Sequence, residues 1–192
     1  GKDSTIRAVF SGCSPSGLMV TSFKAPNQTE LAHDFLWRVH AAVPPRGAFG
    51  VFNRSHYEDV LIVRVKNLVP ESCWQKRYEQ INQFEEHLIR EGVVMVKFCL
   101  HISKQYQKAQ LQERLDDPRK RWKFSTSDLP ERARWEEYQE AYNAALSKCS
   151  TEAAPWYVVP AEHKWFRNLL VARVLVERLE ALKMQYPQPE RD

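Results

Sequence analysis

Residues 93–100 read VVMVKFCL, and this nearly continuous apolar run decides the class of fold. A strand that is covered on one face alternates apolar and polar residues, whereas a strand of a parallel sheet is covered on both faces and is apolar throughout. The run therefore predicts a strand of a mainly parallel sheet with helices on both faces.

The segments around this run alternate between helical and strand patterns. Residues 71–90 follow a proline and carry an apolar stripe at helical spacing, which predicts a long helix. Further helices are expected at residues 5–11, 31–43, 55–65, 125–148 and 162–184, and further strands at residues 18–23, 47–52 and 156–159. Because no linker divides this alternation, we expect one α/β domain over residues 1–192, with right-handed crossovers.

The composition excludes several classes of protein. Hydrophobic residues make up 43% and charged residues 27% of the 192 residues, which excludes a mainly disordered chain. No apolar run approaches the roughly 18 residues of a membrane span, so no membrane partner is expected. The four cysteines are widely scattered and the histidines lack metal-ligand spacing, which favours reduced thiols in a cytoplasmic protein without a zinc site.

The positive charge is concentrated in one segment. Residues 104–123 contain seven lysines and arginines and three acidic residues, which accounts for the whole net charge of +4. A local basic patch on a neutral body predicts an anionic ligand that is held at one place. A solvated helix face without a partner is the alternative.

Two further segments have the residue types that bind phosphate. Residues 1–5 read GKDST and lead into a helix, as the end of a phosphate-binding loop does, although this dipeptide is a weak indication by itself. Asn53 and Arg54 follow a strand, at the edge where open α/β sheets place ligands, and Lys24 follows another strand towards the same edge. An arginine there can hold phosphate oxygens in a fork, but its spacing equally allows a salt bridge to Glu58. Lys24 is otherwise an ordinary surface lysine.

Together these segments resemble a known family. The matching runs, in order, are GKDSTIR, SFKAP, HDFLWR, FNRSHYEDVLIVRV, KRYEQINQFE, KFCLHISK, RLDDP, WKFS and PWYVVPAEHK. They cover almost the whole chain and resemble the family-2 polyphosphate kinases. The form NRSxYE resembles the single-domain subgroup that acts on both nucleoside mono- and diphosphates.

The resemblance implies a fold, a reaction and a cofactor. The fold would be a P-loop kinase core, a parallel sheet flanked by helices as in thymidylate kinase, with a basic helical lid at about residues 104–128. The reaction would move the terminal phosphoryl group of inorganic polyphosphate reversibly to AMP or ADP, and possible further acceptors are GMP and GDP. Mg²⁺ would be the cofactor.

The resemblance also assigns site residues. The catalytic residues would be Lys2 at the Walker A lysine, Asn53 and Arg54 at the Walker B position, and Glu58 in the nucleotide-selecting stretch. The residues that bind nucleotide or polyphosphate would be Lys24, Arg64, Arg114, Lys120, Lys123 and Asp128. The sequence does not assign metal ligands.

The chain departs from the family pattern at two places. The first half of Walker A, with its aspartate, and the strand that leads into it are absent from residues 1–192, so we expect a longer parent protein. In the lid, Gln110 stands where the family usually has arginine.

Two other functions remain open at the level of sequence. One is an ATP-dependent nucleoside monophosphate kinase on the same core, which the basic lid disfavours because ATP needs few phosphate contacts. The other is a non-catalytic polyanion-binding module, although no nucleic-acid recognition motif is present and no nucleic-acid partner is expected. The family resemblance suggests a homo-oligomer, either a dimer or a tetramer.

Overall fold

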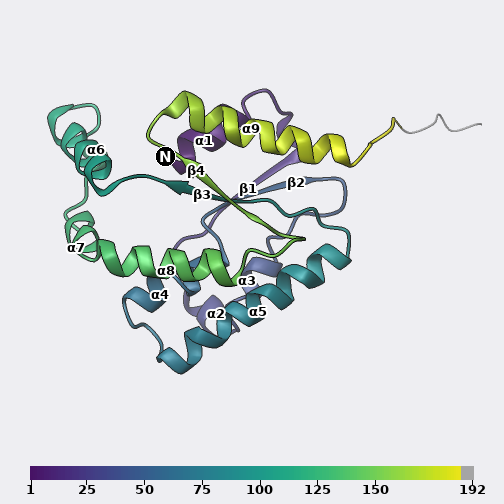
Figure 1. The fold of residues 1–192 in the computed structure, drawn as a ribbon, viewed down its shortest axis with the longest axis horizontal. Coiled ribbons are helices and arrows are strands. Elements are labelled where there is room, and N and C mark those ends of the chain that lie inside the picture. Colours follow the sequence, from purple (N-terminus) through teal and green to yellow (C-terminus); the bar gives the residue numbers. More distant parts are fainter. Residues whose placement is uncertain (187–192) are drawn as a thin grey trace, which may run out of the picture.

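The computed structural model describes residues 1–186 and has three layers (Figure 1). Parallel strands form the middle layer. Helices α1 (Lys2–Val9) and α9 (Lys164–Ala181) cover one face, and helices α5 (Glu71–Arg90) and α8 (Trp135–Lys148) cover the other. Within residues 1–186, no helix has both the length and the apolar character that a membrane crossing requires. The predicted α/β class with parallel strands is confirmed.

The middle layer consists of two parallel strand pairs. β1 (Leu18–Ser22), which follows the short 3-10 helix η1 (Pro15–Gly17), pairs with β2 (Phe49–Asn53). β3 (Lys97–His101) pairs with β4 (Trp156–Pro160). In the described part of the chain β2 and β3 are not hydrogen-bonded to each other, so the expected sheet is present as two separate pairs.

The start of α1 lies beside the ends of both β2 and β3. The side-chain amide of Asn53, the last residue of β2, donates a hydrogen bond of 2.5 Å to Asp3 Oδ1. A Cβ atom on Gly1 would lie 3.9 Å from the side chain of Leu100 in β3.

The main hydrophobic core lies under the face that α5 and α8 cover. The predicted helix at residues 71–90 is confirmed, because its apolar stripe is buried against the residues after β2 and against α8. The helix ends where Gly92 adopts a φ of 92°, a conformation that favours glycine, and Val93 N–H then donates to Leu88 C=O at 3.0 Å. The fully or largely buried members of this core are Tyr57, Val60, Leu61, Val65, Trp74, Tyr78, Ile81, Ala141, Ala145 and Cys149.

A helical excursion projects from one side of the molecule (Figure 1). It contains α6 (Lys104–Asp116), the 3-10 helix η3 (Arg121–Lys123) and α7 (Asp128–Ala133). Ser103 Oγ accepts the N–H of Tyr106 at 3.1 Å and thereby caps α6. No residue of α6 or α7 is buried, so this excursion has little contact with the core.

The predicted helix at residues 31–43 is wrong as a single element. The structure has two short helices instead, α2 (Gln28–Leu31) and α3 (Trp37–His40). Asn27 and Glu30 form a capping box that starts α2 early. Asp34 Oδ1 then accepts the N–H of Leu36 at 2.9 Å, and a local bond of this kind competes with helix continuation.

The predicted helix at residues 55–65 is also divided. It consists of the 3-10 helix η2 (His56–Asp59) and α4 (Ile62–Val65), separated by Leu61 at φ −103° and ψ −87°. The side chains of His56 and Tyr57 both bond to Glu85 in the interior, at 3.2 and 2.8 Å. These tertiary contacts hold the first turn in a conformation that a continuous α-helix would not allow.

Three further boundaries differ from prediction. The apolar run at residues 93–100 forms a strand only from Lys97 onward, because Val94 is exposed. The predicted helix at residues 125–148 breaks at Arg134, whose guanidinium donates to the carbonyl of Val65 at 2.5 Å. The helical segment also starts at Asp128 rather than at residue 125, and Ser125 Oγ accepts the N–H of Ser127 at 3.3 Å.

Candidate active site

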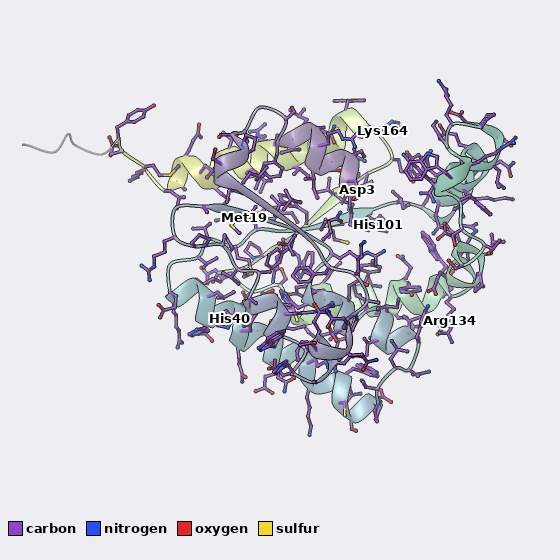
Figure 2. The ribbon with its side chains drawn as sticks, turned by 180° about the vertical axis from the view of Figure 1, so that it is seen from behind. Asp3, Met19, His40, His101, Arg134 and Lys164 are labelled. Atoms are coloured by element: carbon purple, nitrogen blue, oxygen red, sulfur yellow. The ribbon has the colours of Figure 1, made fainter. Side chains whose placement is uncertain are left out.

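Lys2, Lys24, Asn53 and Arg54 are brought to one edge by the parallel strand pair. In register, Ser22 lies opposite Asn53, so both strands end together, and the N–H of Phe23 still donates to Asn53 C=O at 3.1 Å. The Asn53–Asp3 hydrogen bond fastens the start of α1, and with it Lys2, to this edge. Figure 2 shows Asp3, His101 and Lys164 near one another, to the right of Met19.

Arg54 is held in an unusual backbone conformation. Its φ of 63° lies in the left-handed region, which a residue with a side chain rarely adopts. Its Nε lies 3.9 Å from Glu58 Oε1, and the Arg54 side chain is 51% exposed. The salt bridge that the spacing allowed is therefore present, but an exposed pair at this distance contributes little and an anionic ligand can displace it.

Lys24 lies beside a cleft of about 310 Å³ at the end of β1. Arg38 donates from Nη1 to the carbonyl of Lys24 at 2.8 Å, forms a 3.5 Å ion pair with Glu30 and packs over the ring of Phe23. The loop after β1 is thus anchored through its backbone, while the side chain of Lys24 remains exposed.

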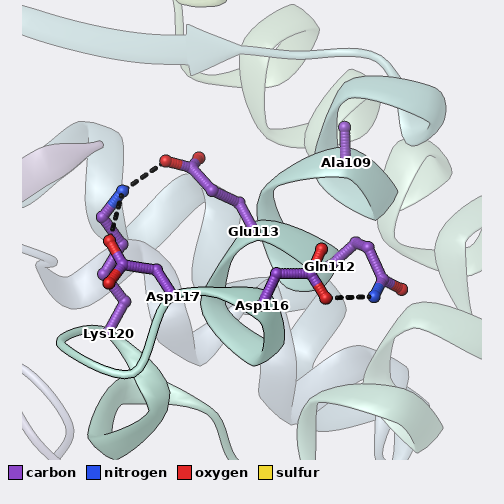
Figure 3. A pocket seen from close by; sticks show the side chains of 6 residues that line it. All are labelled: Ala109, Gln112, Glu113, Asp116, Asp117 and Lys120. Atoms are coloured by element: carbon purple, nitrogen blue, oxygen red, sulfur yellow. Dashed lines mark hydrogen bonds and ion pairs between the residues drawn. The ribbon is translucent and has the colours of Figure 1, made fainter.

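The predicted lid cations are paired with acidic residues of the same excursion. Arg114 Nη1 lies 3.3 Å from Asp128 Oδ2, so two predicted site residues contact each other. Lys120 bonds to Glu113 and lies 3.5 Å from Asp117, which Figure 3 shows at the rim of a pocket. The hydrogen bond from Lys120 lowers the pKa of the Glu113 carboxyl.

Lys123 differs from the other lid cations. Its ammonium lies 5.0 Å from the ring centroid of the exposed Trp122, as a cation–π contact. The pairs around Lys120 and Arg114 are exposed and weak, so the excursion can exchange internal partners for an anion.

The contacts of Arg64 hold its side chain away from the strand edge that carries Asn53 and Arg54. Its guanidinium lies over the ring of Trp74 at 4.8 Å and donates to the hydroxyl of Tyr78 at 3.4 Å. It also lies 4.0 Å from Glu140. These contacts connect α4 with α5 and α8, and the structure does not bring Arg64 into contact with Asn53 or Arg54.

A buried polar cluster behind Arg54 was not predicted. Glu85 accepts hydrogen bonds from Tyr57 at 2.8 Å and from Lys97 at 2.5 Å, and its Oε1 lies 3.2 Å from His56 Nε2. Lys97 also donates to Tyr57 at 3.0 Å and to the carbonyl of Cys149 at 2.7 Å. The cluster holds His56 and Tyr57, the two residues after Ser55, in place. It thereby supports the strained backbone conformation at Arg54.

The sequence contained a signal for this cluster. Glu85 occupies a position of the apolar stripe between Ile81 and Leu88, and Lys97 is the single charged residue in the run at residues 93–100. A charge at such a position requires a buried partner, because an unpaired buried charge is very unfavourable. Which partner it meets cannot be derived from local sequence.

Arg167 is a second functional candidate that sequence reasoning missed. It lies in the first turn of α9 and is 2% exposed. Its Nη2 donates to Ser4 Oγ at 3.3 Å, so it reaches the start of α1. The signal is again a charged residue on the inward face of an apolar helix, one turn before the buried Val171.

The edge offers oxygen ligands for a hard cation. In the described residues no three His, Cys, Asp or Glu side chains gather closely enough to hold a metal ion alone. Mg²⁺ in phosphoryl-transfer sites needs only one or two carboxylates, because substrate phosphates and water supply the other ligands. Asp3, with one oxygen already bonded to Asn53, fits that requirement.

The edge and the basic excursion define a class of protein that handles phosphates. A helix N-terminus with a lysine, an arginine at a strand end and a cationic helical excursion are the elements that bind phosphoryl groups in α/β proteins. The family model described as Polyphosphate kinase 2 matches residues 1–187. The chain belongs to this family, and the resemblance read from the sequence is confirmed.

Two curated relatives have names that state an activity. One from Meiothermus ruber, named AMP/ADP-polyphosphate phosphotransferase, is 61% identical over 190 residues, which is 99% of this chain and 71% of the relative. One from Rhodopseudomonas palustris, named ADP-polyphosphate phosphotransferase, is 49% identical over 200 residues, which is 98% of this chain and 69% of the relative.

Solved structures have the same fold. A crystal structure of polyphosphate kinase 2 from Arthrobacter aurescens TC1 superposes with a TM-score of 0.98 at 46% identity, covering all of this chain and 68% of that one. A putative polyphosphate kinase 2 from Pseudomonas aeruginosa gives 0.92 at 35% identity, over 97% of this chain and 40% of that one.

Proposed function

We propose that this chain transfers the terminal phosphoryl group of inorganic polyphosphate to AMP or ADP. Family membership and the 61% identity to an AMP/ADP-polyphosphate phosphotransferase support the proposal. The observation that carries it is the cationic edge, where the Asn53–Asp3 bond fastens α1 and Lys2 beside Arg54. Neither an ATP-dependent monophosphate kinase nor a binding module is favoured by these relatives.

The finer architecture is part of the proposal. Residues 1–192 form a single phosphotransferase domain with a P-loop kinase core like that of thymidylate kinase. Residues 104–128 form its lid. The excursion supports this assignment, because α6 and η3 have no buried residue and carry the chain's excess positive charge. The protein assembles as a homo-oligomer, either a dimer or a tetramer.

The reaction needs positioning and charge neutralisation more than covalent catalysis. A phosphate oxygen of AMP or ADP attacks the terminal phosphorus, the P–O–P bond breaks, and the shortened polyphosphate leaves with the bonding electrons. Lys2 and Arg54 neutralise charge on the transferred group, and Asn53 orients Asp3 at the same place. Glu58 releases Arg54 when phosphate binds and contributes to the choice of nucleotide.

Most of the remaining predicted residues bind or release the two substrates. Lys24, exposed beside the cleft at the end of β1, contacts phosphate. In the lid, Arg114, Lys120 and Lys123 exchange their present contacts for polyphosphate oxygens, and Asp128 holds Arg114 until then. Closing the lid excludes water and limits hydrolysis. Arg64 acts from a distance, by holding α4 against α5.

Mg²⁺ is the proposed cofactor. Asp3 would hold it together with phosphate oxygens, and the cation would neutralise charge on the phosphates when bound. Asn53 fixes the orientation of this carboxylate through the 2.5 Å hydrogen bond.

The test is a coupled assay on the full-length protein with AMP or ADP, Mg²⁺ and long-chain polyphosphate, without ATP. We expect ADP from AMP and ATP from ADP, and a rate about 10³-fold lower in an Arg54→Ala variant. Turnover with ATP but not with polyphosphate would show the monophosphate kinase instead. No turnover with either donor would leave the polyanion-binding module.

A further inference from the structure

Arg167 places a buried cation at the start of α1. The residue lies in the first turn of α9 and is 2% exposed, and its side chain extends to the neighbouring helix α1. Its Nη2 donates to Ser4 Oγ at 3.3 Å. Its Nη1 would lie only 3.1 Å from a Cβ atom at Gly1, so the guanidinium is directed at the entry to α1.

The charge of Arg167 has no carboxylate partner within residues 1–186. The polar contacts of its guanidinium are the amide oxygen of Asn168, at 3.1 Å from Nε and 2.9 Å from Nη2, and the hydroxyl of Ser4. No hydrogen bond from Nη1 is present in this part of the chain. The buried Lys97, in contrast, has the Glu85 carboxylate at 2.5 Å. Burying an unpaired charge is unfavourable, so an anion at this place would be strongly stabilised.

The entry to α1 is also where an anion finds other donors. The first N–H groups of this eight-residue helix have no intrahelical acceptors, and the helix dipole adds partial positive charge. Lys2 is its first residue. Ser4 and Thr5 donate their hydroxyl groups to Gly1 C=O at 2.8 and 3.0 Å, which fixes the turn.

We propose that Arg167 is a phosphate-binding residue that holds a phosphoryl group at the N-terminus of α1 together with Lys2. This inference rests on the proposed function, since the phosphoryl group belongs to one of its substrates. The ligand chemistry is a phosphoryl oxygen that accepts from the free Nη1, and the group comes from polyphosphate or from the nucleotide. A bound anion supplies the negative charge that residues 1–186 do not.

The alternative is a purely structural role, in which Arg167 only connects α9 to α1. The two roles differ in the ligand-free protein. A buried arginine without a counter-ion is unfavourable there, so a glutamine, which removes the charge, should leave the melting temperature unchanged or raise it. A structural connection would instead be lost, and the melting temperature would fall.

The experiment compares the full-length protein with its Arg167→Gln and Arg173→Gln variants. Arg173 lies on the same helix, but it is exposed and paired with Glu177, so it is a matched control. Calorimetric titration with tripolyphosphate and, separately, with ADP gives two dissociation constants for each protein, and a melting curve without ligand gives the stability. The two titrations identify which substrate donates the phosphoryl group.

We expect Arg167→Gln to weaken binding of one of the two ligands by about 10- to 100-fold, as loss of a charge-assisted hydrogen bond does, with an unchanged ligand-free melting temperature. Arg173→Gln should bind both as the wild type does. Unchanged affinities in Arg167→Gln would overturn the proposal, whether or not the ligand-free melting temperature is lower.

A second variant covers the case that Arg167→Gln does not fold. Arg167→Lys keeps the charge and loses the fork, and it should weaken the same ligand by a smaller factor; unchanged binding would refute the proposal. The coupled assay separates this inference from the proposed function. Arg167-dependent tripolyphosphate binding without phosphoryl transfer would sustain the site and refute the activity, and the reverse result would do the opposite.

Discussion

Replacing Lys97 by methionine removes the cation of the buried cluster behind Arg54. Its ammonium bonds to Glu85, Tyr57 and the carbonyl of Cys149, and both members of the Lys97–Glu85 pair are less than a tenth exposed. The variant therefore leaves a carboxylate in the interior without its cation. Breaking a buried ion pair from one side lowers the free energy of unfolding by about 3–5 kcal/mol.

Removing the second charge should recover much of this loss. A buried ion pair is often nearly neutral relative to uncharged residues of similar volume. The double variant Lys97→Met with Glu85→Gln is therefore expected to be more stable than Lys97→Met alone, by about 2 kcal/mol, because no charge is left unpaired.

The assay is urea unfolding at pH 7 of the full-length protein, followed by tryptophan fluorescence. The control is Arg90→Met, which breaks the 2.6 Å Arg90–Glu86 pair on the surface of α5, the helix that carries Glu85. That exposed pair contributes at most about 1 kcal/mol. A loss in Lys97→Met no larger than in Arg90→Met, or a double variant whose loss is the sum of the two single losses, would refute the reasoning.

Four further measurements test the site. Arg54→Ala should lower the rate of transfer by about 10³-fold, as loss of a charge-neutralising arginine does. The melting temperature should not change, because the ion pair of Arg54 with Glu58 is long and exposed. A melting temperature that falls in proportion to activity would instead favour a structural role for this salt bridge. Lys123→Ala should raise the KM for polyphosphate more than the KM for nucleotide, and equal effects on both constants would remove Lys123 from the polyphosphate channel. The logarithm of the polyphosphate binding constant should fall linearly with the logarithm of salt concentration, and Lys120→Ala should reduce that slope, as loss of a contact to a polyanion does; an unchanged slope would exclude the contact. Burial alone would raise the pKa of Glu85, but the hydrogen bond from His56 and the charge of Lys97 lower this pKa below 4.5. The ionised carboxylate therefore stabilises the folded protein above pH 4.5, and this contribution is lost as the pH falls through the lowered pKa of the folded state. The urea midpoint should fall less below pH 4.5 in Glu85→Gln than in the wild type, and equal falls would exclude Glu85 as the cause.

Much of the fold could be predicted because its signals are local. The helix at residues 71–90 was predicted with the bounds that the structure has, since its apolar stripe repeats over five turns. The short helices after β1 and β2 could not be placed this way. Asp34 interrupts one of them, and the attachment of His56 to a helix 29 residues away interrupts the other. One-turn helices depend on such contacts more than on propensity.

The candidate site divides in the same way. Asn53, Arg54 and Lys24 could be assigned to one edge because parallel strands end together. In the structure Ser22 lies opposite Asn53, so Lys24 and Arg54 follow strand ends at the same edge. The partner of each charged side chain could not be assigned. The Arg64 guanidinium lies over Trp74, away from that edge, because of how α4 packs against α5.

The amino-acid sequence by itself determined the alternation of strands and helices, the concentration of positive charge at residues 104–123 and the order of the family's motifs. Each of these properties is carried by residues that are close together in the chain. Only the tertiary structure decided which buried charges are paired. Glu85 meets Lys97 and is neutralised, whereas Arg167 meets Ser4, 163 residues away, and receives no negative charge from residues 1–186. Electrostatic compensation depends on distance in space, and that distance exists only after the helices have packed.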